Sequence, residues 1–390
     1  MIEPAPIAHT APRRASGAYS NRVMSRSRRP ARPPAVRVPC PPRIREAHAQ
    51  LDDPAAPRIA VVGATGAVGG TLLELIEDRR LPYRRLHLVA SARSAGRTIR
   101  VDGRDHGVSP LSRFDFGTVD AALFCAGEQV SRDWVPVAVA HGALAVDSTS
   151  AFRMDPGTPL VVPQLNAAEL GRRPAGGVIA VPGAATVPVV RVVRDVERRW
   201  GIRRIVVSTY QGASGAGHAG IEELQDGSRT VLQDPQATVP SAEFSPALAF
   251  NVLPGIGDLL EDGSTRQERE LADEVRKVLG LPGIEVTATC ARVPMVSGHG
   301  AAVWVQCRAA VDRAELVALL RALPEVTVHD GGGPTPAALG DPDRLHVGRI
   351  RVSATAPDGF WLWLATDNLR VGGALDAVRI VEELLARGTL

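Results

Sequence analysis

The chain has 390 residues, of which 45% are hydrophobic and 22% charged, a balance that excludes disorder over most of its length and predicts a globular protein with two domains. Its four cysteines, Cys40, Cys125, Cys290 and Cys307, include no CxxC pair, so neither a metal site nor a disulfide framework is indicated and a reducing compartment is favoured. No apolar run reaches the roughly 18 residues of a membrane helix, and the N-terminus lacks the apolar core of a secretory signal. The sequence therefore predicts a cytoplasmic protein without a membrane partner.

Positive charge is concentrated near the N-terminus. Residues 1–56 carry ten arginines against four acidic residues, a formal charge of +6, which leaves −3 for the rest of a chain whose total is +3. This segment is rich in Pro, Arg, Ala and Ser and cannot bury enough apolar surface to order itself, so a disordered tail is predicted. Its prolines oppose the amphipathic helix of an organelle-targeting leader, so a tail, or a start codon assigned too far upstream, explains it better. Nucleic-acid binding is not indicated, because the rest of the chain lacks a basic face with interleaved aromatics.

Ordered structure is expected from Pro57 onward. Residues 58–62 are typical of a buried parallel strand, and the apolar spacing of residues 71–78 predicts a helix after a glycine-rich turn. Further apolar strands, with helical stretches between them, are predicted at residues 86–90, 121–125 and 143–147. Alternating strands and helices predict a Rossmann-type, doubly wound α/β domain over residues 57–182.

A second α/β domain with a mixed sheet is predicted over residues 183–366. Its expected helices and strands, in chain order, are a helix at 186–200, a strand at 204–210, a helix at 265–279, and strands at 285–292, 301–307 and 360–366. The apolar spacing of residues 373–385 predicts a closing helix, within a C-terminal segment, 367–390, that is expected to pack back on the Rossmann domain.

The turn after the first strand carries a variant of the dinucleotide-binding fingerprint. Gly63, Gly66 and Gly69 form the pattern GxxGxxG, in which glycines let the backbone approach a pyrophosphate and the helix N-terminus supplies N–H donors. About twenty residues beyond the turn, where an NAD site has an acid for the ribose hydroxyls, this chain has Arg93 and Ser94. A cation and hydroxyls suit a 2′-phosphate, so NADP is favoured over NAD. The alternatives are a tight turn without a ligand and an exposed loop arginine. The predicted cofactor contacts in these segments are Gly63, Thr65, Gly66, Ala67, Val68, Gly69, Arg93 and Ser94.

Sequence segments spread over nearly all of residues 57–390 resemble one enzyme family. In order and approximate spacing, VVGATGAVGG, ASARSAG, DSTSAFRMD, PLVVPQLN, STYQGASGAG, TATCARVP, the GH at 298–299, VGRIR and TDNLR are similar to aspartate-β-semialdehyde dehydrogenases. The resemblance implies NADPH-dependent reduction of β-aspartyl phosphate to aspartate-β-semialdehyde with release of phosphate, a step towards lysine, threonine and methionine. It also implies a homodimer, with a tetramer possible, that pairs through a second domain used for catalysis and dimerisation.

The resemblance also assigns roles to individual residues. Gln211 would orient the reaction intermediate and His299 would be the general base. Arg292 would hold the substrate α-carboxylate and Arg153 the phosphate, whereas composition alone would make His299 an ordinary loop histidine and Arg292 a surface charge. By the same match, further cofactor contacts would come from Ala126, Gly127, Asp367 and Asn368. No metal site is implied.

The chain departs from the family pattern at the nucleophile. The family segment Asn-Pro-Asn-Cys-Ser-Thr corresponds to Val-Pro-Gly-Ala-Ala-Thr at 181–186, so Ala184 stands where the resemblance places the catalytic cysteine. Gln267 and Glu270 stand where the family has a substrate-binding acid and a phosphate-binding lysine, and a shift of one residue would restore only the acid, as Glu268. Three interpretations remain: a phosphorylating dehydrogenase that works weakly or through another nucleophile, a non-catalytic NADP-binding paralogue with a regulatory or heteromeric role, or a non-covalent aldehyde reductase.

Overall fold

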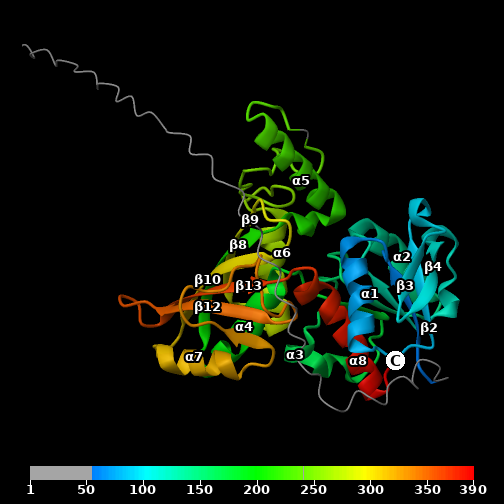
Figure 1. Ribbon diagram of the computed structural model, residues 1–390. Helices are drawn as coiled ribbons and strands as arrows, with labels where there is room; N and C mark the ends of the chain where they lie inside the picture. The colour runs from blue at the N-terminus through cyan, green and yellow to red at the C-terminus, as the bar shows by residue number, and fades with distance from the viewer. Residues whose placement is uncertain (1–54, 240) are drawn as a thin grey trace, which may run out of the picture. The chain divides into compact units, whose positions relative to one another are not determined.

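A computed structural model describes residues 55–239 and 241–390 (Figure 1). The predicted tail at residues 1–56 lies outside the described residues except for its last two positions. Every helix in the described part of the chain is too short or too polar to cross a bilayer. The two predicted sheets are both present, and the α/β class with a Rossmann domain and a mixed second sheet is confirmed.

The first sheet has seven strands in the order β3-β4-β2-β1-β5-β6-β7. All neighbours are parallel except the hairpin of β3 and β4. The strands after β1 are added first on its β2 side and then on its β5 side, so the strand order reverses between β1 and β5. The carboxyl ends of these two strands form the crevice where such folds bind ligands. The strands are β1 (Arg58–Val62), β2 (Arg85–Ala90), β3 (Thr98–Val101), β4 (Arg104–Pro110), β5 (Ala121–Phe124), β6 (Leu144–Asp147) and β7 (Val178–Ala180).

Helices cover both faces of this sheet. The side chains of β1, which point alternately to the two faces, contact helices on both sides. Ile59 and Val61 pack in one apolar cluster with Leu72 and Leu75 of α1 (Ala67–Arg79). Ala60 and Val62 point to the opposite face of the sheet and pack in a second apolar cluster with residues of α2 (Glu128–Ala140). Successive strand side chains point to opposite faces, so a strand covered on both sides is apolar throughout.

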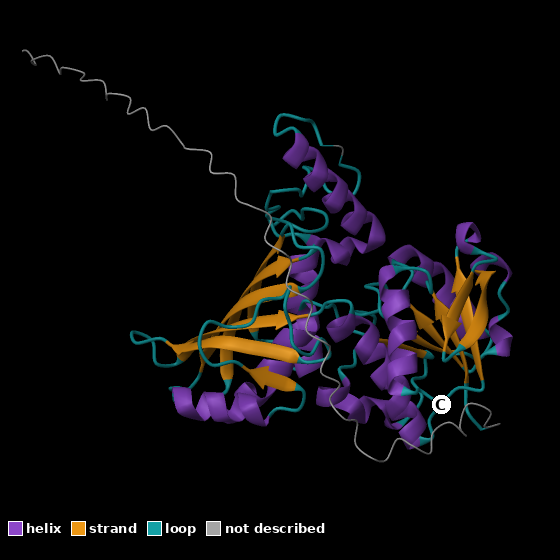
Figure 2. Cartoon of the chain, in the orientation of Figure 1, coloured by secondary structure: helices purple, strands orange, loops and turns teal. Residues whose placement is uncertain are grey.

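The second sheet has six strands in the order β11-β12-β13-β10-β8-β9 and is mixed. Figure 2 shows its helices gathered on one side. The strands are β8 (Ile202–Gln211), β9 (Glu285–Arg292), β10 (His299–Cys307), β11 (Val326–Val328), β12 (Leu345–Val352) and β13 (Gly359–Thr366), and the helices are α4 (Thr186–Trp200), α6 (Arg266–Leu279) and α7 (Arg313–Ala322). In β8, Ile205 and Val207 are buried towards the helices, whereas Tyr210 on the other face is exposed.

A helical arm interrupts the second domain between β8 and α6. It comprises α5 (Gly217–Gln233) and the loops that follow, and it has a small apolar core of its own around Leu224, Phe244 and Leu248. The sequence predicted no helix or strand between residues 210 and 265, so α5 was missed. The polar and glycine-rich composition of α5 conceals its helical spacing, because Gly220 and Gly227 occupy two of its buried positions.

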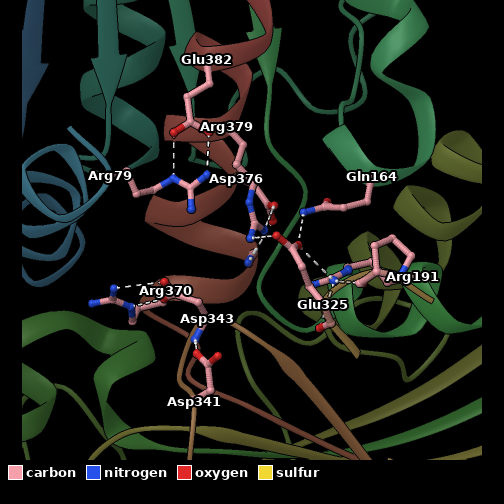
Figure 3. Close-up of polar contacts among 12 residues, drawn as sticks. Arg79, Gln164, Arg191, Glu325, Asp341, Asp343, Arg370, Asp376, Arg379 and Glu382 are labelled. Atoms are coloured by element: carbon pink, nitrogen blue, oxygen red, sulfur yellow. Dashed lines mark hydrogen bonds and ion pairs between the residues drawn. The ribbon is translucent and has the colours of Figure 1, made fainter. Parts of the chain in front are cut away.

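The C-terminal helix α8 (Leu375–Arg387) lies beside α1, since Arg79 of α1 pairs with Glu382 at 2.7 Å. Figure 3 shows the charged residues around this helix, with Arg191 of α4, Arg379 and Asp376 grouped near Glu325. Arg191, Asp376 and Arg379 are all buried. Burial raises the pKa of Asp376 and lowers that of Arg191. This ionic cluster joins α4 to α8.

The segment before α8 is held close to the start of α4. Gly372 has φ +77°, and its backbone N–H donates to the Asp376 carboxylate at 3.1 Å. A Cβ placed on Gly372 would lie 2.6 Å from the Cα of Ala184. Only glycine satisfies both the backbone conformation and this close approach.

Candidate active site

A cavity of about 480 Å³ opens between the carboxyl end of the Rossmann sheet and the second sheet. It is lined by residues that follow β5, by the start of α2, by the segment just before α4, by the ends of β8 and β9, by α6 and by the segment before α8. Ten residues singled out from sequence lie in its wall: Val68, Gly127, Arg153, Ala184, Gln211, Gln267, Glu270, Arg292, His299 and Asn368. The rest of the predicted set, Gly63, Thr65, Gly66, Ala67, Gly69, Arg93, Ser94, Ala126 and Asp367, is not part of the wall.

The glycine turn has the geometry that a pyrophosphate requires. Gly63 has φ +101°, and a Cβ there would lie 2.9 Å from the backbone of Ala126. A Cβ on Gly69 would lie 2.1 Å from the carbonyl oxygen of Gly63, so the helix can start this close to the strand only with glycine. Gly66 precedes α1 without a side-chain cap. The first-turn N–H groups at Ala67 and Val68 are therefore available to an anion.

The predicted 2′-phosphate segment lies at the carboxyl end of β2. Arg93 and Ser94 belong to a short 3₁₀ helix, Ala92–Ser94. The Thr65 hydroxyl donates to the Ser94 hydroxyl at 3.2 Å, which ties this segment to the glycine turn. Arg93 is exposed and makes no ion pair with any residue that the structure describes.

Three predicted residues meet on one rung of the second sheet. Gln211 pairs with Arg292 across the parallel β8–β9 contact and with His299 across the antiparallel β8–β10 contact. Gln211 is 1% exposed, and its side-chain N–H donates to the Thr209 hydroxyl at 3.1 Å. Its side-chain oxygen accepts a 3.3 Å hydrogen bond from Gln267 of α6. Strand register therefore brings a guanidinium, an amide and an imidazole to one wall.

His299 is a buried imidazole that stays neutral at physiological pH. Its Nδ1 lies 2.9 Å from the carbonyl oxygen of Gly298, and because a carbonyl only accepts, Nδ1 carries the proton. Nε2 consequently has a free lone pair. Burial lowers the pKa of His299 to about 4, and the nearby Arg292 cation contributes in the same direction. The group is a base rather than a proton donor.

Arg292 is a buried cation held in a fixed orientation. One Nη donates to the carbonyl oxygen of Gly212 at 2.9 Å, and the guanidinium lies over the Phe244 ring at 5.9 Å. A Cβ on Gly215 would lie 2.4 Å from the same Nη, so glycine leaves room for the guanidinium. Burial lowers its pKa to about 10, which still leaves it charged at pH 7. Among the described residues, Arg292 has no carboxylate partner.

Ala184 lies in the cavity wall just before α4, between Gly183 and Ala185. Cys125 is the one cysteine of the described residues that lines this cavity. Its thiol donates to the carbonyl oxygen of Val62 at 3.2 Å, and burial raises its pKa to about 12. Cys290 is a buried residue of β9, and burial raises its pKa to about 11.

Arg153 already uses its three nitrogens within the protein. Nη1 contacts Glu274 at 2.9 Å, while Nε and Nη2 donate to the carbonyl oxygens of Val181 and Ser148. Glu274 is 1% exposed, and its other oxygen accepts the N–H of Gly183 at 2.8 Å. The guanidinium that was expected to hold phosphate is thus engaged in a buried ion pair.

Asn368 and Asp367 organise the segment that leads to α8. The side-chain oxygen of Asn368 accepts from the Ser214 hydroxyl at 2.9 Å and from the N–H of Gly298 at 2.8 Å. Asp367 accepts from the N–H groups of Leu369 and Arg370 and so shapes the turn below the cavity. Asn368 lines the cavity, whereas Asp367 does not.

Comparison with known proteins places the chain in a family. Residues 58–172 match the domain described as "Semialdehyde dehydrogenase, NAD binding domain", and residues 196–371 match "Semialdehyde dehydrogenase, dimerisation domain". An aspartate-semialdehyde dehydrogenase of Aquifex aeolicus is 36% identical over 339 residues, which is 85% of this chain and 99% of the relative. The chain belongs to the aspartate-semialdehyde dehydrogenase family.

Solved structures of aspartate-semialdehyde dehydrogenases have the same fold. Aspartate semialdehyde dehydrogenase II from Vibrio cholerae is 37% identical, with a TM-score of 0.82, and the match covers 85% of this chain and 99% of that one. An enzyme from Candida albicans, solved with NADP, is 19% identical with a TM-score of 0.65, so its likeness shows the fold alone. The predicted NAD(P)-binding domain and dimerisation domain of this oxidoreductase family are confirmed.

Sequence reasoning missed the charged residues that surround the predicted ones in this member of the aspartate-semialdehyde dehydrogenase family. Arg266 pairs with Glu270 at 2.9 Å and also with Glu128, and all three line the cavity. Ser150 donates to Glu128 at 2.8 Å. Glu128 is the first residue of α2 and directly follows Gly127, a predicted cofactor contact. This neighbour was the one feature of the sequence that could have identified Glu128 as a site residue. The contact from Arg266 depends on tertiary structure, because 138 positions separate the two residues.

Proposed function

We propose that this chain is an NADP(H)-binding member of the aspartate-semialdehyde dehydrogenase family that does not perform the family's covalent, phosphate-dependent step. The observation that carries this proposal is Ala184. It lines the cavity at the position where the sequence match places the nucleophilic cysteine. A methyl group cannot attack a carbonyl, and the loss of a nucleophile from a cooperating catalytic group typically costs about a million-fold in rate, or about 8 kcal/mol.

The three cysteines in the described part of the chain do not supply a substitute. Cys125 lines the cavity, but its thiol is hydrogen-bonded to the Val62 carbonyl and its pKa of about 12 keeps it protonated at pH 7. Cys290 and Cys307 are buried and do not line the cavity. Reactive cysteines sit in exposed, electropositive surroundings, and none of these three does.

His299 argues against a non-covalent reductase as well. Direct hydride transfer to an aldehyde needs a proton donor at the carbonyl oxygen. The Nδ1 proton of His299 is directed at the Gly298 carbonyl, and Nε2 has a lone pair at neutral pH because the pKa is lowered to about 4. The site thus contains a base without a thiol to deprotonate. Binding without chemistry accounts for these residues best.

The cofactor proposed is NADP(H), bound by the glycine turn and by Arg93 with Ser94. The exposed Arg93 guanidinium and the Thr65–Ser94 pair are the groups that suit a 2′-phosphate. We expect Arg93→Ala to weaken NADPH binding by roughly tenfold while leaving NADH binding unchanged, as the loss of one charge-assisted contact predicts. The exposed neighbour Arg97 gives the matched control, Arg97→Ala, and equal losses for both nucleotides would refute the assignment.

The decisive test is turnover of aspartate-β-semialdehyde. Phosphate- or arsenate-dependent reduction of NADP is measured for the unaltered protein, with NADPH binding recorded on the same preparation. Binding of NADPH without turnover is the expected result. Turnover by the unaltered protein would refute the proposal and require another nucleophile.

A homodimer is proposed through the exposed face of the six-stranded sheet. Tyr210 with Trp363 and Trp304 with Trp361 form two aromatic pairs there, with ring centroids 5.6 and 5.5 Å apart. Tyr210 and Trp361 are 40% and 37% exposed. Aromatic residues of this kind are enriched at the cores of interfaces. Light scattering should give a dimer that Trp361→Arg dissociates and Met154→Arg, at another exposed apolar residue, does not; a dimer that survives Trp361→Arg would exclude this face.

A further inference from the structure

Three guanidiniums line the cavity, and they differ in whether a carboxylate neutralises them. They belong to Arg153, Arg266 and Arg292. A cation that is already paired within the protein offers less to an anionic ligand, because the ligand must replace an existing partner. The pairing of these three groups therefore predicts which charges a ligand of this site can carry.

The pair of Arg153 and Glu274 is buried and complete. The Arg153 side chain is 12% exposed and that of Glu274 2%, with 2.9 Å between their nearest atoms. The remaining nitrogens of Arg153 donate to backbone carbonyls. The Gly183 N–H, at the approach to α4, donates to the same carboxylate at 2.8 Å. Two donors that could bind a phosphate are thus both committed to Glu274.

Arg266 pairs with two carboxylates. It contacts Glu270, four residues further along α6, and also Glu128 at the start of α2. Both carboxylates line the cavity. Glu128 is paired a second time, with Arg132 at 2.8 Å, so the two carboxylates on this side of the cavity are matched by two guanidiniums and neither guanidinium is left unpaired for an anionic ligand.

Arg292 differs from the other two. It is 7% exposed and donates to one backbone carbonyl, and no described carboxylate lies within ion-pair distance of it. A buried cation without a counter-ion is energetically costly unless a bound anion pairs with it. The planar guanidinium can donate two parallel hydrogen bonds to a carboxylate. The site thus has one open anionic position, at Arg292.

From this distribution of charge we infer that the cavity binds a small, non-phosphorylated monocarboxylate, with its carboxylate on Arg292 and a neutral hydrogen-bond donor towards Glu270 and Glu128. A phosphate dianion placed near Arg153 would meet three carboxylates and only already-paired cations. The inference rests on the proposed function, since it names the ligand of the same site. It also conflicts with the phosphate-holding role that the resemblance gave to Arg153.

A matched pair of ligands tests the charge requirement. Succinamate and 3-phosphonopropionate share a carboxylate and a two-carbon spacer, but the first ends in a neutral amide and the second in a phosphonate. Isothermal titration of the NADPH-saturated protein should show binding of succinamate and at least about tenfold weaker binding of 3-phosphonopropionate, the scale expected for one repulsive charge contact. Equal affinities, a preference for the phosphonate, or binding of neither compound would overturn the inference.

Variants separate the two ends of the site. Glu270→Lys should strengthen 3-phosphonopropionate binding by about tenfold or more, whereas Glu270→Gln removes the charge without reversing it and should give a smaller gain. Arg292→Gln should weaken succinamate binding by about a hundredfold, with Arg292→Lys between the two. Retained NADPH binding shows that each variant is folded. Failure of Glu270→Lys to improve phosphonate binding in a folded protein would refute this inference, while the proposed function would fall only to turnover by the unaltered chain.

Discussion

Gln211 and His299 face each other as a paired position of β8 and β10, and Arg292 occupies the matching position of β9 on the other side of Gln211. Arg292 and His299 follow Gln211 by 81 and 88 positions in the sequence. Strand pairing nevertheless places the three residues in one row across three strands. The pairing of strands fixes these side chains more firmly than loops would, because each backbone is held by ladder hydrogen bonds. Ala184 lies outside these three strands, so the frame does not depend on the side chain at that position.

The buried imidazole of His299 makes stability depend on pH. Its pKa is lowered from the ordinary value near 6.5 to about 4 in the folded protein, so below pH 6.5 the unfolded chain binds the proton more readily. The contribution to stability is fully present above pH 6.5 and is lost as pH falls towards 4, by up to about 3 kcal/mol. Urea unfolding of the protein and of His299→Gln between pH 7.5 and about 4.5 should show a steeper decline for the unaltered chain.

The exposed His141 supplies the control for this measurement. His141→Asn is the matched replacement of an imidazole that lies outside the cavity. If the unfolding free energies of the unaltered protein and of His299→Gln fell in parallel with pH, the pKa of His299 would be the same in the folded and unfolded chain. The neutral state assigned to this imidazole would then be wrong.

Gly69 and Gly70 differ sharply in what a methyl group would meet. A Cβ on Gly69 would lie 2.1 Å from the Gly63 carbonyl, whereas nothing lies within 4 Å of one on Gly70. We expect Gly69→Ala to displace α1 from the turn and weaken NADPH binding by tenfold or more, on the order of the loss of one phosphate contact. Gly70→Ala should bind normally and gain up to about 1 kcal/mol in stability from the reduced freedom of its unfolded chain. Fluorescence titration with NADPH and thermal unfolding decide between these outcomes, and equal binding by both variants would contradict the assigned turn.

The fold could be predicted because its signals are local. The helix at 186–200 and the strand at 285–292 were predicted with the observed bounds, since their apolar periodicity is strong. The hairpin of β3 and β4 was not predicted, because only Val101 and Val108 of its residues are buried and the alternation is weak. The helix α5 was missed because glycines fill its buried positions.

The sequence identified single residues of the site, but it could not identify the residues with which they form hydrogen bonds and ion pairs. Matching segments identified Arg292 and His299, and strand register then brought them together. The partner of Arg153 is Glu274, 121 positions away, and no local pattern reports such a pair. The sequence also predicted a phosphate role for Arg153 without any indication that its nitrogens are already occupied.

The ionic cluster of α8 should contribute to the stability of the whole described part of the chain. Arg379 is buried and contacts both Glu325 and Asp376. Arg379→Met leaves the buried Asp376 carboxylate without this cation, at a cost of about 3 kcal/mol. Arg387, on the same helix, makes an exposed pair with Glu383 at 3.1 Å, and Arg387→Met should cost at most about 0.5 kcal/mol. Denaturant unfolding measures both, and similar small losses would mean that solvent reaches the cluster.

The position of Ala184 should activate a thiol introduced there. It precedes α4, whose N-terminus has no side-chain cap, and the neutral imidazole of His299 lines the same cavity. A helix N-terminus favours thiolate and the imidazole can accept the thiol proton, so Ala184→Cys should be alkylated by iodoacetamide at pH 7 at least about tenfold faster than Cys125, Cys290 or Cys307. Cys125, Cys290 and Cys307 should react slowly, because burial raises their pKa values to about 12, 11 and 12. Peptide mass mapping assigns each adduct, and adding His299→Gln to Ala184→Cys should slow the labelling at position 184. A slow thiol at that position would mean that the cavity does not provide the electrostatics of a nucleophile site, so the loss of chemistry proposed above would involve more than the side chain at position 184.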